Sequence, residues 1–171
     1  MTYLEEYLAK KNLSQNLALP SARAKNKHGR WVYGSYMTHI NRTPSPIGDR
    51  ITDEDVRFLI VMDGFSDWNM PRDIEGIDVD PNTVCKNSFV RDMNGVLIYE
   101  GDILFYEEFG FEGVVCFGTY TPTTYQQDNT AQGFYVSWKD VKHKGISKYI
   151  RNDLCYWTSR CKVIGTIFDD Q

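Results

Sequence analysis

The sequence predicts a mainly β protein, an SH3-like barrel or roll with extra strands, a short N-terminal helix and a long acidic loop. Aromatic residues make up 14% of the chain, eleven of them Tyr, and aromatic side chains favour strands. Many short apolar segments are separated by closely spaced turn signals, a pattern typical of barrels and rolls. Residues 92–106, DMNGVLIYEGDILFY, show this pattern best, because glycine turns hinge two apolar strands there.

Residues 1–16 are predicted to form a helical arm that precedes the β domain. Thr2 and Glu5 have the spacing of a capping box, which satisfies backbone amides at a helix start. Four apolar residues then share one helical face: Tyr3, Leu4, Tyr7 and Leu8. A helix of about ten residues is marginal alone, so this face must pack on its own domain or on a neighbouring subunit.

The first half of the chain contains three predicted strands and one long loop. The strands lie at residues 17–24, 30–40 and 57–62, with turns at 26–29 and 52–55. Pro20 places the first strand at a sheet edge, because proline lacks a backbone donor. Residues 63–80 are rich in Gly, Asp and Pro, which predicts a loop with a functional or packing role.

Six further strands are predicted at residues 83–90, 96–99, 103–106, 111–120, 133–138 and 162–168. Asn94 and Gly95 are interpreted as a two-residue hairpin turn, because both residues tolerate the positive φ that a primed turn needs. Residues 121–132 are polar and predict an exposed loop. Residues 139–151 are basic and leave a loop or a helical turn open.

Several segments resemble, in order, the signature of the YopX family, small proteins encoded by phages and prophages of Gram-positive bacteria. The central pieces are VDPNTV at residues 79–84, DMNG at 92–95 and IYEGDI at 98–103. RWVYGS at 30–35, GFYV at 133–136 and VIGTIF at 163–168 resemble its N-terminal hairpin, a late strand and the closing strand. The residues that carry this structural signature are Asp92, Asn94, Gly95, Tyr99, Glu100, Gly101, Asp102 and Gly165.

The resemblance spans residues 17–171 and implies one YopX-like β domain of phage or prophage origin, in the cytoplasm of a bacterial host. Two departures stand out. CKNSFV at residues 85–90 replaces an aromatic, glycine-bearing stretch of the family, and Thr166 stands where Asn is usual. The family has no established activity, so the resemblance implies fold and origin and leaves function to the residues.

Composition and motifs argue against membrane, metal and catalytic roles. No apolar run approaches the roughly 20 residues that span a bilayer. Cysteines 85, 116, 155 and 161 form no C-x-x-C pair and the three histidines are scattered, so we expect reduced thiols and neither metal nor cofactor. The chain also lacks the motifs of a nucleophile elbow or a phosphate-binding loop, and no catalytic residue is assigned.

Two groups of carboxylates, the Glu100–Asp102 pair and the acidic stretch at residues 53–80, each allow two interpretations. Glu100 and Asp102 are either an acid–base or metal-binding pair, or turn residues in which Asp102 bonds backbone amides and Glu100 pairs with a cation. The second is favoured, because Gly101 breaks the strand between them. The acidic stretch at residues 53–80 is interpreted as solvated loop surface, with DNA mimicry as the alternative.

Charge is unevenly distributed along the chain, whose formal net charge is −4. Residues 51–110 carry four Lys/Arg against fourteen Asp/Glu, whereas residues 1–50 carry eight against three. Two basic stretches contain aromatic residues, a combination that suits phosphate contact and base stacking. The candidate contacts are Arg23, Lys25, Lys27, Arg30 and Trp31 in the first, and Lys139, Lys142, Lys144, Lys148 and Arg151 in the second. The alternative is solvated turns beside core aromatics.

The function that these observations favour is a non-enzymatic protein-interaction module, in which loops on a rigid β scaffold contact an unidentified phage or host protein. The alternative is a nucleic-acid-binding accessory protein that uses the two basic and aromatic stretches. The apolar face of the N-terminal helix and exposed strand edges also predict a homo-oligomer.

Overall fold

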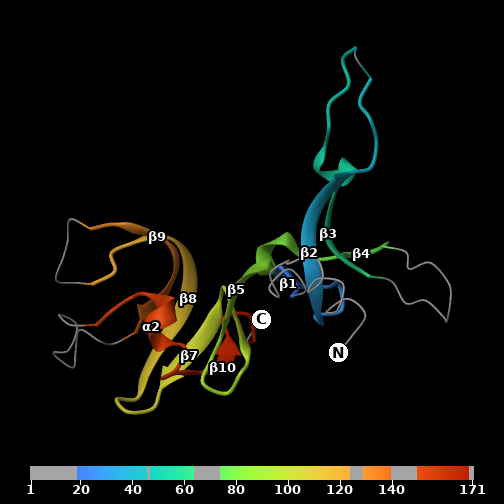
Figure 1. The fold of residues 1–171 in the computed structure, drawn as a ribbon. Coiled ribbons are helices and arrows are strands. Elements are labelled where there is room, and N and C mark those ends of the chain that lie inside the picture. Colours follow the sequence, from blue (N-terminus) through green and yellow to red (C-terminus); the bar gives the residue numbers. More distant parts are fainter. Residues whose placement is uncertain (1–18, 46, 64–73, 124–128, 140–149, 170–171) are drawn as a thin grey trace, which may run out of the picture. The chain divides into compact units, whose positions relative to one another are not determined.

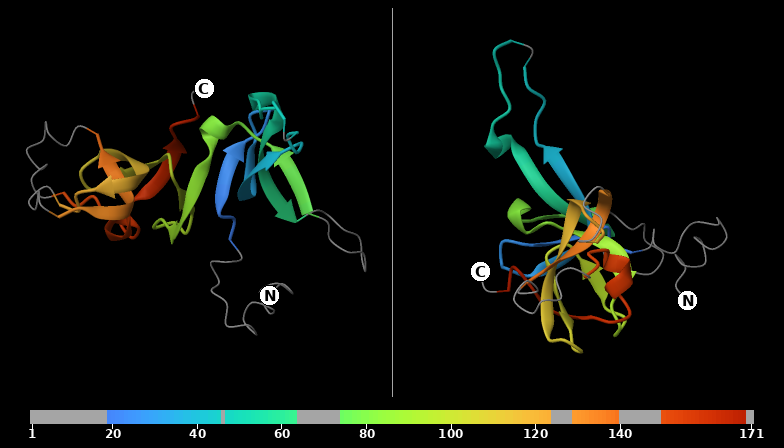
Figure 2. Two further views of the ribbon diagram at one scale, coloured as in Figure 1. Left: turned by 90° about the horizontal axis from the view of Figure 1, so that it is seen from above. Right: turned by 90° about the vertical axis from the view of Figure 1, so that its left-hand side faces the viewer.

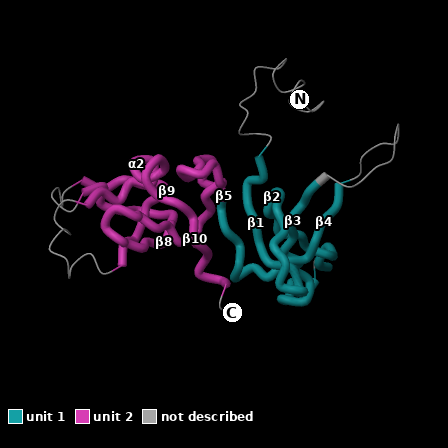
Figure 3. The backbone as a smooth tube through the Cα atoms, turned by 90° about the horizontal axis from the view of Figure 1, so that it is seen from below, with its two compact units in different colours: residues 1–86 teal, residues 87–171 magenta. Residues whose placement is uncertain are grey.

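The computed structural model describes residues 19–45, 47–63, 74–123, 129–139 and 150–169. The chain divides into two compact units, residues 1–86 and 87–171, and each unit has a core of its own (Figure 3). The expected helical arm and the centre of the acidic loop fall outside the described residues. The sequence suggested no boundary near residue 86, and the assignment of residues 17–171 to one family domain stays a prediction.

Unit 1 is built on one antiparallel sheet with the strand order β4-β3-β2-β1 (Figure 1). Its strands are β1 (Ala22–Lys25), β2 (Trp31–Ile40), β3 (Val56–Asp63) and β4 (Ile74–Asp78). The first residues of β5 (Cys85–Arg91) pair with β1, with Cys85 opposite Arg23. Strand β1 is therefore flanked on both sides, and its predicted edge position is wrong. Pro20 lies before the strand and removes no ladder bond from it.

Strands β2 and β3 form a long hairpin that extends past the other strands of unit 1 (Figure 2). Beyond Gly34 on β2 and Phe58 on β3, whose carbonyl still accepts from the Val79 amide at 3.0 Å, the two strands pair only with each other, out to Ile40 opposite Val56. A short 3₁₀ turn, η2 (Asp53–Asp55), ends the loop as predicted. We call the stretch from Ser35 to Phe58 the hairpin arm.

The core of unit 1 is small. Four residues are buried in it, Ala22, Ala24, Ile60 and Val79, and Val32, Phe58 and Val84 pack around them. A second 3₁₀ turn, η3 (Pro81–Thr83), is joined to β1, because the Lys25 amide donates to the Thr83 hydroxyl at 2.8 Å. Strand β4 corrects the prediction that residues 63–80 are all loop. Its sequence IEGID alternates poorly, yet Ile77 lies opposite the buried Ile60.

Unit 2 contains a four-stranded antiparallel sheet of order β10-β7-β8-β9. Its strands are β7 (Asp102–Tyr106), β8 (Phe111–Tyr120), β9 (Ala131–Trp138) and β10 (Lys162–Thr166). A hairpin of β5 and β6 (Leu97–Tyr99) precedes the sheet, and a single helical turn, α2 (Leu154–Trp157), precedes β10. Alternation on β8 places Phe111 and Val115 inward, as expected for a strand with one buried face.

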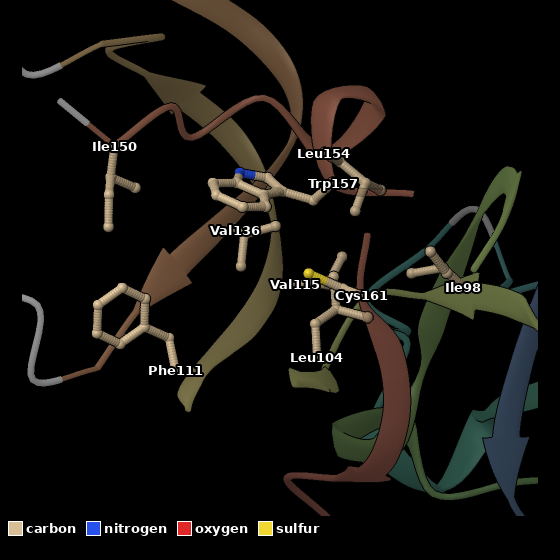
Figure 4. Close-up of a cluster of buried hydrophobic side chains, with 9 residues drawn as sticks. All are labelled: Ile98, Leu104, Phe111, Val115, Val136, Ile150, Leu154, Trp157 and Cys161. Carbon is tan, nitrogen blue, oxygen red and sulfur yellow. The ribbon is translucent and has the colours of Figure 1, made fainter. Parts of the chain in front are cut away.

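Nine buried side chains form the core of unit 2 (Figure 4). They come from the sheet, from α2 and from the segments beside it: Ile98, Leu104, Phe111, Val115, Val136, Ile150, Leu154, Trp157 and Cys161. The outer edge of β9 is partly covered, since the Val136 amide donates to the Asn152 carbonyl at 2.8 Å and Tyr135 bridges Asp153. Covering an edge in this way limits unwanted strand pairing.

The prediction of a mainly β fold is confirmed. The described strands form open antiparallel sheets and close no barrel, so the finer SH3-like assignment is not confirmed. Strand β8 spans the predicted residues 111–120, and the other predicted strands differ from those observed mainly at their ends.

Candidate functional site

Asp92 connects three segments of unit 2 through its buried carboxylate. Its Oδ1 atom accepts hydrogen bonds from the amides of Asn94 and Val96, each at 2.8 Å. Its Oδ2 atom accepts from the amide of Val163 on β10 at 2.9 Å. Hydrogen bonds from backbone amides compensate a buried carboxylate for lost hydration. Asp92 thus joins the β5–β6 turn to the closing strand and serves a structural role.

The turn after Asp92 differs from the predicted two-residue primed turn. The Gly95 amide donates to the Asp92 carbonyl at 3.0 Å, and the Asp92 amide donates to the Val96 carbonyl at 2.8 Å. Gly95 has φ +82°, whereas Asn94 does not take a positive φ. The loop is therefore a three-residue turn that ends in a left-handed glycine. The loop is wider than the Asn94-Gly95 pair predicts, because the Asp92 carboxylate accepts from the amides of both Asn94 and Val96.

Asp102 and Gly101 form the corner between β6 and β7. The buried Asp102 carboxylate accepts from the Tyr99 amide at 2.8 Å, and Gly101 turns the chain at φ +82°. Gly101 also donates to the Val115 carbonyl and accepts from the Ile167 amide. This geometry supports the structural interpretation of the Glu100–Asp102 pair. The cation expected beside Glu100 is not found among the described residues. Gly165 lies in β10 next to a register shift opposite β7.

Strand β5 carries an irregular residue on the same hairpin. Phe89 has φ +60°, a value that bulky residues rarely adopt, and its side chain is 39% exposed. The Asn87 side chain accepts from the Phe89 amide at 2.8 Å, and the Ser88 hydroxyl donates to the Ile98 carbonyl at 2.6 Å. Its two preceding neighbours therefore hold Phe89 in this conformation.

The first basic stretch lies on β1, β2 and the turn between them. The Arg23 guanidinium lies 4.5 Å from the centre of the Trp31 ring, and the Lys25 ammonium lies 5.6 Å from it. Arg23 itself is largely buried, whereas Lys27 and Arg30 are exposed on the turn. The structure thus brings together Arg23, Lys25 and Trp31, and leaves the two turn cations facing solvent.

Only the ends of the second basic stretch are described, at Lys139 and Arg151, and Lys142, Lys144 and Lys148 lie outside. Arg151 belongs to a cluster that sequence reasoning did not find. Its guanidinium lies 5.0 Å from the centre of the Tyr156 ring, and the Arg160 guanidinium lies 4.2 Å from the same ring. All three side chains are exposed. Eight residues lie between the two arginines in sequence, so no local motif indicates the cluster.

Hydrogen bonds around Asp153 and Glu108 change the acidity of two tyrosines. Burial, together with the hydrogen bond from its hydroxyl to Asp153 at 2.8 Å, raises the pKa of Tyr120 to about 12. A hydrogen bond from the Tyr106 hydroxyl to Glu108 raises the pKa of Tyr106 to about 12. Both phenols are therefore neutral hydrogen-bond donors at physiological pH, and neither is a ready general base.

Three acidic residues described in unit 1, Asp49, Asp55 and Asp78, pair with arginines. Arg42 donates to Asp55 at 2.6 Å and to Asp49 at 2.5 Å at the tip of the hairpin arm, and Arg57 pairs with Asp78 on the sheet. The Arg42 hydrogen bonds hold the pKa of Asp55 and of Asp49 below their usual range. These carboxylates are solvated and paired, which supports the loop-surface interpretation for this part of the acidic stretch.

Exposed apolar side chains gather on the β2–β3 hairpin of unit 1. Tyr36 and Ile40 project from one face of β2 and Tyr33 and Met37 from the other, since successive residues of a strand alternate. Ile40 is 50% exposed and Met37 is 44% exposed. The described strands of unit 1 lie edge to edge in one sheet, so no second described sheet of that unit covers the hairpin arm.

The four cysteines are free thiols, as predicted. Burial raises the pKa of Cys161 to about 12 and also raises that of Cys116, so both thiols are poor nucleophiles. Within the described residues, no group of three or more His, Cys, Asp or Glu side chains is placed to hold a metal ion. Among the same residues, no helix has the length and apolar character needed to cross a bilayer.

Comparison with known proteins identifies no relative: no protein-family model and no curated protein matches the chain.

Proposed function

We propose that the chain is a non-enzymatic protein-interaction module of a YopX-like phage or prophage protein, and that it binds a phage or host protein in the bacterial cytoplasm. The exposed apolar surface of the β2–β3 hairpin carries this proposal. Four apolar residues of β2 are between 38% and 50% exposed: Tyr33, Tyr36, Met37 and Ile40. Beyond Gly34, the edge of β2 that faces away from β3 pairs with no described strand. Apolar surface and open strand edges are what protein partners bind.

The proposal includes a finer fold assignment for unit 2, as a relative of SH3-like rolls. Three observations support it. Strands β7, β8 and β9 form a meander, β10 returns to pair with β7, and a single helical turn precedes β10. The buried Asp92 and Asp102 make this unit a rigid scaffold by tying its turns to its strands. A rigid scaffold lets neighbouring loops and hairpins present binding residues at little entropic cost.

A capture experiment tests the interaction module. Wild-type protein and the Tyr36→Ser/Ile40→Ser variant are immobilised and exposed to lysates of infected and uninfected host cells. Ile164→Ser is the matched control, because Ile164 is 47% exposed and lies in unit 2. We expect one partner to be captured by wild type and control and lost with the arm variant. Equal capture by all three would remove the hairpin arm from the proposal, and detection of turnover would overturn its non-enzymatic part.

Self-association belongs to the same proposal, because the arm of one copy can cover the arm of another. Light scattering of wild type should then report more than one chain per particle, and the Tyr36→Ser/Ile40→Ser variant should shift toward the monomer. A monomeric wild type at micromolar concentration would remove the homo-oligomer and leave the heterologous partner.

Nucleic-acid binding is the second candidate function, and a specific observation favours it. Each unit contains a cation–aromatic cluster, Arg23, Lys25 and Trp31 in unit 1, and Arg151, Arg160 and Tyr156 in unit 2. Fluorescence anisotropy with labelled duplex DNA, single-stranded DNA and RNA tests it. Binding should weaken with salt and fall when Lys142, Lys144 and Lys148 are changed to Glu. No binding at low salt would exclude this candidate.

A further inference from the structure

Two arginines converge on one exposed aromatic ring in unit 2. The guanidinium carbons of Arg160 and Arg151 lie 4.2 Å and 5.0 Å from the centre of the Tyr156 ring. Tyr156 is 37% exposed at α2, and both arginines are exposed beside it. Guanidinium groups on an aromatic face retain donors at their edges, which are free to bind an anion in a bidentate manner.

Hydrogen bonds fix the backbone of Arg151 and the side chain of Arg160. The Arg151 carbonyl accepts from the indole nitrogens of Trp157 at 2.8 Å and Trp138 at 3.4 Å. The Arg160 guanidinium donates to the Tyr156 carbonyl at 2.8 Å. Ordering the long Arg160 side chain before binding lowers the entropy that a ligand must overcome. This part of the cluster is therefore preorganised.

The cluster carries an excess of positive charge. Asp153 is the carboxylate that pairs with Arg151, at 3.3 Å, and it also accepts from the Tyr120 hydroxyl. Among the described residues, Arg160 has no carboxylate within ion-pair distance. Within the described part of the chain, Arg160 and Arg151 thus have one carboxylate, that of Asp153, as an ion-pair partner. An anionic ligand is what this surface attracts.

Aromatic rings continue from the cluster along the same unit. Tyr156 contacts the buried Trp157 edge-on at 5.0 Å, Trp157 contacts Tyr106 at 5.2 Å, and Tyr106 contacts Phe109 at 5.6 Å. Phe109 is 48% exposed. The row thus has an exposed ring at each end. The Glu108 carboxylate accepts from the Tyr106 hydroxyl and places a negative charge near the Phe109 end of the row. An anion is therefore expected to bind at the Tyr156 end.

We propose that Arg151, Arg160 and Tyr156 form a binding site for single-stranded nucleic acid, in which the two guanidinium groups bind a backbone phosphate and the exposed part of the Tyr156 ring contacts a neighbouring base. The inference rests on nucleic-acid binding, the second function proposed above, and assigns it to one site. Single strands are favoured over duplex because unpaired bases can reach aromatic rings, whereas the bases of a duplex are already stacked.

The test measures anisotropy of a labelled oligothymidylate of about 12 nucleotides, at salt concentrations from about 50 to about 200 mM. The variants are Arg160→Gln, Tyr156→Leu and Tyr156→Phe, in the full chain. Arg91→Gln is the matched control, since exposed Arg91 in the same unit bonds only the Gly95 carbonyl among the contacts described for its side chain. Thermal unfolding of each variant checks that unit 2 remains folded.

Arg160→Gln should weaken binding several-fold and reduce the slope of log affinity against log salt by about 0.7. Tyr156→Leu should weaken it roughly ten-fold, and Tyr156→Phe should restore most of the affinity because it retains the ring. Arg91→Gln should bind as wild type does. Binding by wild type that the cluster variants leave unchanged, or that all variants weaken equally, would overturn this site alone. Absence of wild-type binding at the lowest salt would overturn the site and nucleic-acid binding together.

Discussion

Units 1 and 2 have similar lengths but bury their apolar residues very differently. Unit 2 encloses nine buried side chains between a sheet, a helical turn and a hairpin, including Trp157 and Leu104. The described part of unit 1 has four buried residues in its core cluster, two of them alanines, and Leu59 and Cys85 are buried outside that cluster. Its most exposed residues include apolar ones such as Ile40. Unit 2 thus has the larger core, whereas the core of unit 1 is small and its hairpin arm leaves apolar side chains such as Met37 exposed.

Buried polar groups show the same contrast. In unit 2, the carboxylates of Asp92 and Asp102 are buried and accept backbone amides. The ion pairs described in unit 1, such as Arg57 with Asp78, are solvent-exposed. Exposed pairs contribute little to stability, whereas losing a buried acceptor leaves amides without a partner. The buried carboxylates that accept backbone amides therefore lie in unit 2, whereas the described carboxylates that pair with arginines on the unit 1 hairpin and sheet are at least partly exposed.

Truncating one apolar side chain in each unit should give the largest difference. Leu104→Ala removes a fully buried side chain and should cost about 3 kcal/mol of unfolding free energy. Ile40→Ala, on the exposed arm, should cost less than about 0.5 kcal/mol. Denaturant unfolding followed by tryptophan fluorescence and circular dichroism measures both. A loss of unfolding free energy for Ile40→Ala as large as that for Leu104→Ala would show that the arm is covered in solution. The contrast in burial between the two units would then hold only for the isolated chain.

Replacing a buried and an exposed aspartate sharpens the polar side of the comparison. Asp92→Asn leaves one carbonyl oxygen for three amide donors, those of Asn94, Val96 and Val163, and should cost about 2 kcal/mol. Asp78→Asn weakens only the exposed pair with Arg57 and should cost less than about 1 kcal/mol. Chemical denaturation reports both values. Equal costs would contradict a structural role specific to Asp92.

Sequence reasoning predicted most strands because local signals and tertiary structure agree there. Strand β8 is one example, where inward apolar residues alternate with outward ones. It missed β4, whose Ile74 and Gly76 give no clear pattern, and which forms because β3 offers an edge. The turn type at Asn94 was also wrong, since the deciding group is the Asp92 carboxylate rather than the Asn-Gly pair.

The candidate site was less predictable than the fold. Arg151 was found because it lies in a basic stretch, but Arg160 and Tyr156 were not. Their contact depends on α2 turning the chain after Arg151, and on two indoles that bind the Arg151 carbonyl. Cation–aromatic contacts of this kind follow from tertiary placement, for which composition and spacing provide no signal.

Phe89 allows a smaller test of how unit 2 holds its hairpin. Both Phe89→Gly and Phe89→Ala remove the ring, so their difference isolates the backbone. At φ +60° the glycine variant should be more stable than the alanine variant by about 1 kcal/mol, because a Cβ atom is disfavoured there. Thermal and chemical unfolding of the pair measure this difference. In an ordinary strand the order reverses, and that reversed order would contradict the left-handed conformation.

The smallest effect is expected at the tip of the unit 1 arm, on acidification. Arg42 lowers the pKa of Asp55 and of Asp49 in the folded chain, so their stabilising contribution is complete above the unfolded value of about 4. It should be lost as the pH falls below that value and through the lower folded pKa. The Thr52 amide, which donates to Asp55 at 2.9 Å, should then exchange faster with solvent, while the amides of Asn94 and Val96 in unit 2 stay protected longer. Hydrogen exchange between pH 5 and about pH 2, corrected for intrinsic rates, measures both sites.

Because the ion pair of Arg42 with Asp55 is exposed, the midpoint of global unfolding should scarcely move when Arg42 is changed to Gln. A large shift of that midpoint would mean that the arm is part of the stable core and would remove the contrast between the two units.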